Sequence, residues 1–337
     1  MVSIYDIAEI AGVSPTTVAN VLAGRGRFSK KTADLVHKIA REQGYVANQA
    51  ARSLNSGKSG MIGIVTTDIS NDYFSSIVVE IERLMHSAGF SSLICNTYYS
   101  AISLDDYLGE LRQRNSDGIF VVGSAGTSDF SALAQTPCVL IDYAKDCHPD
   151  RYVAIDNDKA LLMHDQVKTL ADHGCKRIAL LALEGPGPFE PDRPIHQYYQ
   201  EALEDCGAAF DPSLLIVGPH VKKSHIESYE LIDDALERGV SFDGIVAVGD
   251  RQAYGAVEAI CAHGLTPGRD ILVIGMDNSL YSQLSHPKIS TIDRHTDKMA
   301  RLGSEAMVAL LKGEEPKSRK AVIPHHVVER ETTLGMA

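Results

Sequence analysis

A one-residue turn between two predicted helices constrains the N-terminal part of the chain most strongly. The first helix is predicted to begin after Ser3 and to end at Gly12, and the second begins after Ser14 with Pro15 at its first position. Ser14 can accept a hydrogen bond from a free backbone N–H, and Pro15 lacks a donor where none is needed. Because only Val13 lies between Gly12 and Ser14, the two helices cannot pack antiparallel. This spacing predicts a helix-turn-helix unit, whose second helix enters the major groove of DNA.

A third helix and an apolar core complete this predicted unit. The third helix is expected to begin after Ser29 and to end at Gly44. The residues expected to be buried are Ile4, Ile7, Ala8 and Ala11 in the first helix, Val18, Val21 and Leu22 in the second, and Leu35, Val36 and Ile39 in the third.

The charge of the chain is divided unevenly along its length. Residues 1–58 hold eight Lys and Arg and four Asp and Glu, a net charge of +4, whereas the whole chain carries −12. A basic segment on an acidic protein is typical of a domain that binds phosphates. A small helical bundle that binds another protein is the alternative for these residues.

Length and composition limit the class of protein. A chain of 337 residues is long enough for two or three domains. No apolar run approaches the roughly 20 residues of a membrane span, and the N-terminus lacks the apolar core of a signal peptide, so we expect a cytoplasmic protein. The six cysteines are scattered without a CxxC pair, which predicts reduced thiols rather than a disulfide or zinc framework.

After Gly60 the pattern alternates between strand and helix, which predicts an α/β core with two doubly wound parallel sheets, one before and one after about residue 160. The predicted strands are Met61–Val65, Ser92–Cys95, Gly118–Val122, Cys138–Ile141, Arg177–Leu183, Gly244–Val248 and Asp270–Ile274. The predicted helices are Phe74–Ala88, Leu104–Asn115, Lys159–His173, Ile195–Cys206, Ile226–Arg238, Arg251–His263 and Lys298–Leu311.

Ligands of such sheets bind beyond the carboxyl ends of the strands, which places a site between two facing lobes. Carboxylates, amides and aromatic rings there suit a small polyhydroxylated ligand. The residues at these positions are Asp68, Asn71, Tyr73, Phe74, Asp142, Asp250, Asp277 and Asn278. Each Asp has an alternative role as a helix N-cap, Asp250 in particular.

Enzyme motifs are missing from the sequence. It has no G-x-G-x-x-G after a strand, no G-x-S-x-G and no H-E-x-x-H, and the GKS at Gly57–Ser59 lacks the upstream glycine of a phosphate-binding loop. His325 and His326 are adjacent, which points their side chains to opposite faces of a strand and argues against a joint metal site. We therefore expect a protein that is not an enzyme, with no cofactor and no metal.

Nearly the whole sequence resembles the LacI/GalR family of bacterial transcriptional repressors. The resemblance is carried by the segments IYDIAEIAGVSPTTVANVLAG, FSKKTADLVHKIAREQGYVANQAARSL, IGIVTTDISNDYF, SDGIFVVG, VLIDY, RIALLAL, GIVAVGDRQAYGAVEAI, VIGMDN and ISTID. It implies a periplasmic-binding-protein-like core of two lobes behind a DNA-binding head. The implied parts are a head at 1–45, a hinge at 46–60, a first core subdomain at 61–160 with 290–320, and a second at 161–289 with 321–337.

The resemblance also implies residues that contact DNA. Pro15, Thr16 and Asn20 match positions that face base edges, and Thr17 matches one that contacts phosphate. In the hinge, Asn48, Ala51 and Leu54 match a helix that binds the minor groove, with Leu54 as the wedge. A hinge helix this short is marginal in water and is expected to form only on DNA; packing of Leu54 on the core is the alternative. With Ser14, these form the predicted DNA-binding set.

The departure at Asn20 is informative because an Arg is common at that position in the family. Asn is suited to adenine, whereas Arg favours guanine, so an unusual operator base is expected there. Contact of Asn20 with the DNA backbone alone is the other interpretation.

The implied effector site is altered at its cationic positions. Tyr73, Phe74, Asp142 and Asp277 match effector contacts, but Ile195 stands where the family has a ligand-gripping Arg, and Gly249 replaces an Asn. The cationic donor is then expected at Arg294 or Arg193, with His196 close to Arg193 in the sequence, and Asp250 stays in the predicted effector set as a strand-end residue. A relocated Arg suits an acidic sugar, a phosphorylated metabolite or a nucleoside, besides an ordinary sugar.

The expected function is ligand-controlled binding of palindromic operator DNA by a homodimer. A dimer is favoured over a tetramer because no leucine-heptad helix follows VVERETTLGMA. A solute-binding protein of the same two-lobed fold, without DNA function, is the alternative, as is a purine-responsive or nucleoside-responsive repressor of the same family.

Overall fold

The computed structural model describes residues 2–22, 24, 26–45, 58–123, 136–143, 152–184, 194–219 and 224–335. The chain divides into two compact units, Met1–Gly60 and Met61–Ala337, each with its own core. Among the helices of the described residues, none is long and apolar enough to cross a membrane.

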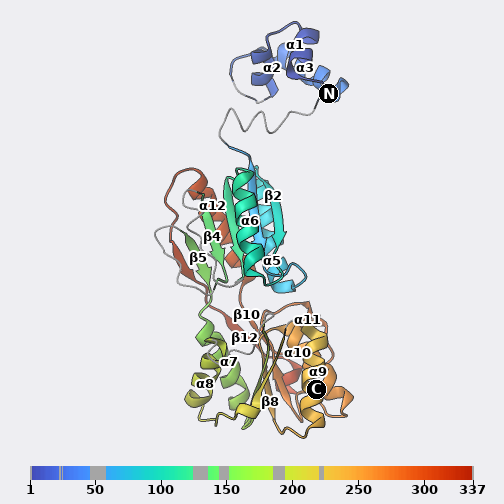
Figure 1. Ribbon diagram of the computed structural model, residues 1–337, viewed down its shortest axis with the longest axis vertical. Helices are drawn as coiled ribbons and strands as arrows, with labels where there is room; N and C mark the ends of the chain where they lie inside the picture. The colour runs from blue at the N-terminus through green and yellow to red at the C-terminus, as the bar shows by residue number, and fades with distance from the viewer. Residues whose placement is uncertain are drawn as a thin grey trace. The chain divides into compact units, whose positions relative to one another are not determined.

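The N-terminal unit contains the three helices that the sequence predicts (Figure 1). They are α1 (Ile4–Ala11), α2 (Pro15–Leu22) and α3 (Lys30–Glu42). Ser3 caps α1 in a capping box with Asp6, and Gly12 ends it in a left-handed conformation at φ 65°. Because Gly12 adopts this conformation without strain, α2 begins three residues later in a new direction.

The core of the N-terminal unit contains most of the predicted residues, but Ile4, Ala11 and Leu22 are only partly buried and Leu35 is exposed. Ile7, Val18, Val21 and Val36 are fully or almost fully buried where the three helices meet. Leu35 was expected in this core, but its side chain is 42% exposed. The buried side of α3 is formed by Val36, Ile39 and Ala40. Because a helix has 3.6 residues per turn, Leu35 lies at the edge of that side and stays partly in solvent.

The larger unit contains a six-stranded parallel sheet and a four-stranded parallel sheet. The first has the order β11-β5-β4-β3-β1-β2. Its strands are β1 (Met61–Thr66), β2 (Ser91–Asn96), β3 (Gly118–Val122), β4 (Cys138–Ile141), β5 (Val153–Asp156) and β11 (Lys320–Val322). Helices α5 (Asp72–Ser87) and α12 (Thr296–Leu311) pack against each other and share a core with one face. Helix α6 (Ala101–Gln113) contributes Leu104, Leu108 and Leu111 to the core on the other face.

The second sheet has the order β7-β6-β8-β9. Its strands are β6 (Ile178–Glu184), β7 (Leu215–Pro219), β8 (Gly244–Ala247) and β9 (Leu272–Ile274). Helices α9 (Ser224–Glu237) and α10 (Asp250–Ala262) share one core with this sheet, and α7 (Lys159–Asp172) and α8 (Pro194–Asp205) share the other. Each sheet is therefore covered on both faces, as the apolar strand sequences predict.

The chain passes between the two sheets three times. It leaves β5 of the first sheet for α7, returns through β10 (Thr291–Asp293) to α12, and crosses again from β11 into β12 (His326–Val328). Strands β10 and β12 pair antiparallel as a separate two-stranded ribbon, which Figure 1 shows between the two lobes. The remaining short helices are a 3-10 turn (Pro212–Leu214), α11 (Leu280–Leu284) and α13 (Glu331–Leu334).

The predicted doubly wound α/β class is confirmed, and the predicted strands and helices agree with the observed ones to within a few residues. Strands β5, β7, β10, β11 and β12 were not predicted. β10, β11 and β12 have three residues each, which is too short for an apolar run to stand out from a loop. The scattered cysteines of the described residues are free thiols, as expected.

Candidate functional site

Helix α2 presents polar side chains outward and apolar ones inward. Ser14 caps the N-terminus of α2, because its hydroxyl accepts a hydrogen bond from the Thr17 N–H at 3.1 Å. Thr16 and Asn20 are exposed on the side away from buried Val18. Pro15 and Thr17 are half-buried, so only part of the predicted set faces fully into solvent. The three hinge residues of that set, Asn48, Ala51 and Leu54, lie outside the described residues.

In the larger unit, Arg294 connects residues of both lobes. Its guanidinium donates to Asp142 at 2.6 Å, to Asn157 at 3.0 Å and to Asp277 at 3.5 Å. Asp142 follows β4 of the first sheet, and Asp277 follows β9 of the second. Arg294 is only 7% exposed, and its Cζ lies 4.1 Å from the centroid of the Tyr73 ring. We call Arg294, Asp142, Asp277, Asn157 and Tyr73, together with Lys159, the Arg294 cluster.

The carboxylates on the first-lobe side of the Arg294 cluster pair with two cations, Arg294 and Lys159. Lys159, at the start of α7, lies 3.0 Å from Asp142 and 3.3 Å from Asp156. Burial by itself raises the pKa of the Asp142 carboxyl, but Arg294 and Lys159 outweigh it and lower that pKa to about 2. Burial, reinforced by the charge of Asp142, raises the pKa of Asp156 to about 6. Asp142 therefore stays ionised, while Asp156 resists ionisation.

The second-lobe carboxyls lie in a site that disfavours negative charge. Burial raises the pKa of Asp277 well above its usual value, and the nearby Asp250 and Asp142 raise it further while Arg294 opposes them. Burial also raises the pKa of Asp250 to about 6, against hydrogen bonds that favour its charged form. Asp250 accepts from the Ser279 N–H and the Thr291 hydroxyl, each at 2.6 Å. One carboxylate oxygen of Asp250 thus holds the loop that carries Asp277, and the other holds the start of β10.

Two aromatic rings lie at the start of α5. Tyr73 and Phe74 meet edge to face with ring centroids 5.2 Å apart. Tyr73 is buried, and its hydroxyl donates to the sulfur of Met299 at 3.6 Å. Phe74 is only partly buried. The two rings therefore differ in role, because Tyr73 supports Arg294 while Phe74 retains exposed surface.

A second contact between the lobes was missed by the sequence reasoning. Arg251, on α10, lies 3.8 Å from the Asp68 carboxylate beyond β1, and its Cζ lies 5.8 Å from the centroid of the Tyr281 ring. Arg251 is 8% exposed, and its Nε has no hydrogen-bond partner among the described residues. Burial next to Asp68 also raises the pKa of Tyr99 to about 12. Arg251 directly follows Asp250, and its basic side chain at the carboxyl end of β8 was the available signal.

The remaining predicted effector residues lie on different helices or outside the described residues. Asp250 is the first residue of α10 and Gly249 is its N-cap, so the N-cap role considered for Asp250 is wrong. His196 lies on α8 and is 1% exposed. Arg193 lies outside the described residues. Asn157 and Lys159 join the Arg294 cluster without having been predicted, because β5 just before them was not recognised as a strand.

Comparisons with known families agree with this two-part organisation. Residues 3–48 match the model of bacterial regulatory proteins of the lacI family, and residues 167–333 match that of a periplasmic binding protein-like domain. The first match spans the helix-turn-helix unit. The second spans the second sheet and the β10–β12 ribbon.

Full-length relatives show the same organisation from end to end. The chain is 29% identical over 337 residues to the HTH-type transcriptional regulator DegA of Bacillus subtilis, with 98% of each chain covered. It is 29% identical over 332 residues to the HTH-type transcriptional repressor PurR of Pasteurella multocida, covering 97% of this chain and 96% of that protein.

Solved structures share the fold. A structure of the Lac repressor dimer bound to operator and an anti-inducer has a TM-score of 0.83 at 24% identity, with 99% of each chain covered. A complex of the transcriptional regulator CelR with cellobiose has a TM-score of 0.68 at 22% identity, covering 98% of this chain and all of that one. The chain thus combines a DNA-binding domain of the lacI family with a periplasmic binding protein-like domain, and it is similar over almost its whole length to HTH-type transcriptional regulators.

Proposed function

We propose that this regulator binds palindromic operator DNA as a homodimer and that a small neutral molecule, bound at the Arg294 cluster, controls that binding. The observation that supports this most directly is the set of hydrogen bonds from Arg294 to Asp142 of the first lobe and Asp277 of the second. A ligand that changes these contacts changes how the lobes are joined. The proposed parts are the head at 1–45, the hinge at 46–60 and the two core subdomains.

For DNA reading, we propose base contacts from the exposed face of α2. Thr16 and Asn20 are exposed there, and Asn offers a donor and an acceptor that match adenine. Thr17 is assigned to phosphate, while Ser14 and Pro15 hold the first turn of α2. The hinge residues Asn48, Ala51 and Leu54 remain proposed minor-groove contacts.

The charges of the Arg294 cluster favour a neutral ligand rich in hydroxyl groups. In and beside the cluster, Asp142, Asp156 and Asp277 form ion pairs with Arg294 or Lys159, and a fourth carboxyl, that of Asp250, is buried close to Asp277. Three of these carboxyls have raised pKa values, which means that added negative charge is disfavoured at the cluster. We therefore set aside the acidic sugars and phosphorylated metabolites that the presence of Arg294 suggested in the sequence.

The proposed ligand contacts come from the cluster and from residues outside it. Asp142 and Asp277 accept hydrogen bonds from ligand hydroxyls, and Arg294 donates to ligand oxygens. The exposed part of the Phe74 ring covers an apolar C–H face. Arg193 and His196 stay proposed contacts from the second lobe.

Two classes of neutral ligand remain, and specific relatives favour each. CelR was solved with cellobiose, which is a sugar, whereas several full-length relatives are named PurR. The sugar is our first choice because the carboxylates of the cluster outnumber its aromatic rings. A purine or nucleoside is the second.

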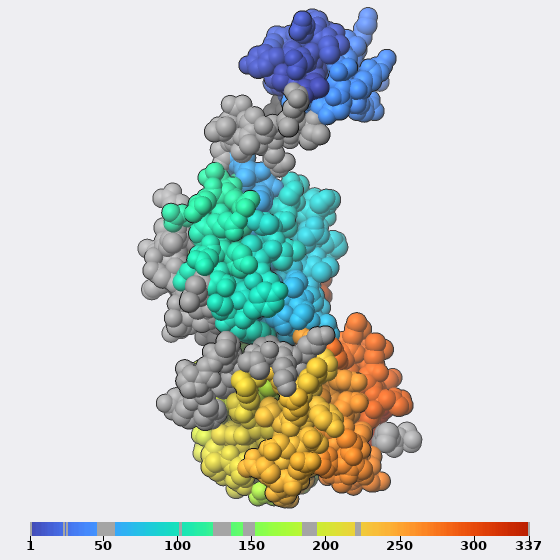
Figure 2. Space-filling view, turned by 45° about the vertical axis from the view of Figure 1, so that its right-hand side comes forward, coloured from blue at the N-terminus to red at the C-terminus, as the bar shows by residue number. Residues whose placement is uncertain are grey.

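An exposed apolar surface supports the homodimer. Leu280 and Leu284 of α11 are 61% and 76% exposed, and with Tyr254 and Tyr281 they line one surface pocket. Figure 2 shows the orange segments that contain these residues at the surface of the second lobe. A second copy of the chain would bury these side chains, as an isologous interface does.

The proposed control is a coupling between two binding equilibria. Ligand binding shifts one lobe against the other, and this change alters the spacing of the two hinges in the dimer. Operator DNA must then change ligand affinity by the same factor as ligand changes operator affinity. Equal ligand affinity with and without operator would contradict the proposal.

The first experiment is a thermal-shift screen of neutral sugars, purines and nucleosides, with sugar acids and sugar phosphates as the contrasting sets. A ligand that binds only the folded state raises the melting temperature. We expect hits among neutral compounds, lost in Arg294→Met and retained in Arg301→Ala, whose side chain is exposed on α12. Hits confined to acids and phosphates would overturn the proposed class.

The second experiment measures binding to a palindrome selected from random DNA. Affinity is expected to fall steeply with salt because phosphate contacts release counterions. The absence of a preferred palindrome in every ligand state would refute DNA control. We further propose that the protein acts in the cytoplasm and turns over none of its ligands, which product analysis after incubation with each hit would check.

A further inference from the structure

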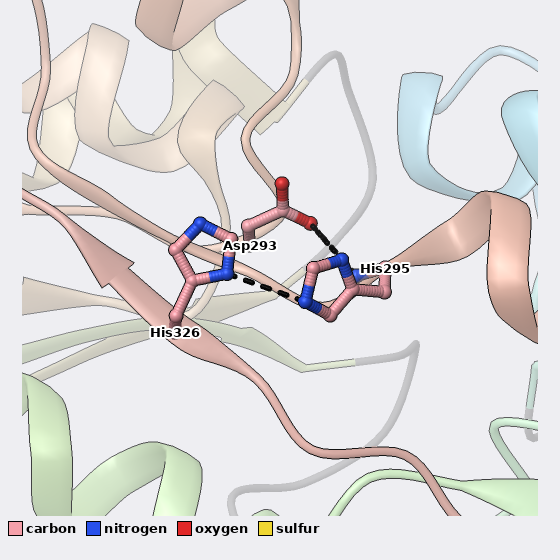
Figure 3. Close-up of side chains that lie close together, drawn as sticks. All are labelled: Asp293, His295 and His326. Atoms are coloured by element: carbon pink, nitrogen blue, oxygen red, sulfur yellow. Dashed lines mark hydrogen bonds and ion pairs between the residues drawn. The ribbon is translucent and has the colours of Figure 1, made fainter.

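Three potential metal ligands lie together at the β10–β12 ribbon. Asp293 ends β10, His295 is the N-cap of α12, and His326 begins β12. One donor atom from each of the three lies within 4.8 Å of the others. Figure 3 shows the two imidazoles meeting, with the Asp293 carboxylate beside His295. We call these three residues the ribbon triad.

The distances in the ribbon triad match those of a transition-metal site. His326 Nδ1 and His295 Nε2 are 3.3 Å apart. Two ligand atoms about 2.0–2.1 Å from a tetrahedral zinc ion lie about 3.3 Å apart as well. The Asp293 Oδ1 lies 3.6 Å from His295 Nδ1. The Asp293 carboxylate is the third donor, beside the two imidazoles.

The side chains of the ribbon triad are held but not sealed from solvent. Asp293 accepts from Asn278 at 2.9 Å and from the His295 backbone N–H at 2.8 Å, which fixes its carboxylate. The side chains of His295 and Asp293 are 35% and 25% exposed, and His326 is exposed. An ion can therefore reach the three donors, and water can complete its coordination.

His325 does not take part in the ribbon triad. Its Nε2 contacts the Asp165 carboxylate at 2.9 Å, on α7, whereas His326 faces His295. The two neighbours thus point apart, as the strand alternation predicts. The expectation that the chain has no metal site rested on this adjacent pair and on the absence of CxxC and H-E-x-x-H motifs. It missed His295, which lies 31 positions away from His326 in the sequence.

We propose that Asp293, His295 and His326 bind one divalent transition-metal ion, with zinc as the best match. Two imidazoles and one carboxylate suit zinc and its neighbours rather than calcium or magnesium, which prefer all-oxygen sites. The ion joins two of the three crossings between the lobes, one before α12 and one after β11. Bound metal therefore restrains the motion of one lobe against the other.

Metal binding at the ribbon triad would also restrain Arg294. Arg294 lies between Asp293 and His295 in the sequence, and its side chain contacts Asp142 and Asp277 instead of the triad. Fixing its two neighbours fixes the backbone from which Arg294 reaches both lobes. The site itself does not depend on the proposed function, because its detection needs neither DNA nor effector.

The test is calorimetric titration of the chelator-treated full-length chain with zinc chloride. The variants are His326→Ala and His295→Asn; Asn is chosen because it tolerates the left-handed backbone of residue 295, at φ 56°. We expect one zinc ion per chain in the wild type and an affinity at least about 100-fold weaker in each variant, since even a lost supporting group costs 10–100-fold. His86→Ala, exposed on α5, is the matched control and should bind as the wild type does.

A second set of measurements distinguishes the ribbon triad from thiols and from unfolding. Cys261→Ser removes an exposed thiol and should leave the titration unchanged. Circular dichroism checks that each variant is folded. Hydrogen exchange of residues 290–296 and 323–329 should slow with zinc in the wild type and not in His326→Ala. Equal zinc affinity in the wild type and both ribbon variants, or no zinc binding by the wild type, would overturn the proposal.

Discussion

The guanidinium of Arg294 donates to the carboxylate of Asp142 at 2.6 Å, although the two residues are 152 positions apart in the chain. Asp142 follows a strand of the first sheet, whereas Arg294 follows the ribbon between the lobes. The same guanidinium reaches Asp277 beyond the second sheet. One buried cation thus serves acceptors on both lobes, and its loss affects stability and ligand binding together.

Removal of the Arg294 charge is expected to destabilise the core strongly. Arg294→Met keeps much of the side-chain volume but leaves Asp277 buried without its cation and Asp142 with Lys159 alone. Breaking a buried ion pair from one side costs about 3–5 kcal/mol of unfolding free energy. Urea unfolding followed by circular dichroism measures it. Arg301→Ala breaks an exposed pair with Asp297 and should cost less than about 1 kcal/mol. Equal losses in the two variants would contradict this account of the cluster.

The buried carboxyl of Asp250 predicts a pH dependence of stability. Its pKa is about 6 in the folded protein against 3.8 ordinarily, so between these values the folded state binds more protons than the unfolded state. The stabilisation by protonated Asp250 is therefore complete below pH 3.8 and is lost as the pH rises through 6. The unfolding free energy of the wild type, minus that of Asp250→Asn, should fall by on the order of 3 kcal/mol across this range.

Urea titrations at half-unit steps of pH measure that difference. Asp270→Asn is the control, because hydrogen bonds from Arg269 and Thr266 lower the pKa of Asp270 to about 2. Its contribution is present above pH 3.8 and is lost as the pH falls towards 2, which is the opposite direction. A flat difference for Asp250→Asn between pH 4 and 7 would exclude the raised pKa.

Asn20 should determine one base of the operator. Asn20→Ala is expected to reduce discrimination at that base by about 1–3 kcal/mol, because a bidentate contact to adenine is lost. Binding-site selection followed by anisotropy measures it. Glu9→Gln, exposed on α1, should leave the preference unchanged. Selection of guanine by the wild type at this position, or unchanged preference in Asn20→Ala, would show that Asn20 contacts only the DNA backbone.

Leu284 should contribute to self-association. Leu284→Asp introduces a charge into the exposed apolar surface of α11 and is expected to weaken the dimer at least tenfold, or by about 1.4 kcal/mol. Sedimentation equilibrium measures the dissociation constant. Leu161→Asp changes a 47% exposed leucine on α7 and should leave the dimer intact. A dimer of wild-type strength in Leu284→Asp would place the interface elsewhere.

Local sequence signals were sufficient to predict the head and most of the α/β core. Ser3, Gly12 and Ser29 mark helix ends through hydrogen bonds and backbone conformations that involve only neighbouring residues. Apolar runs such as Gly118–Val122 predict buried strands directly, because burial on both faces leaves no polar alternation. The strand-end positions of Asp142 and Asp277 also followed from that pattern.

Tertiary structure decided how those residues work together. From the sequence, Arg294 suited an acidic sugar, a phosphorylated metabolite or a nucleoside, but the fold surrounds its charge with Asp142, Asp277 and Asn157. It likewise brings His326 to His295 through two three-residue strands too short to predict. Local propensity acts over a few residues, whereas charge balance and metal geometry depend on groups that only folding of the whole core brings within a few ångströms.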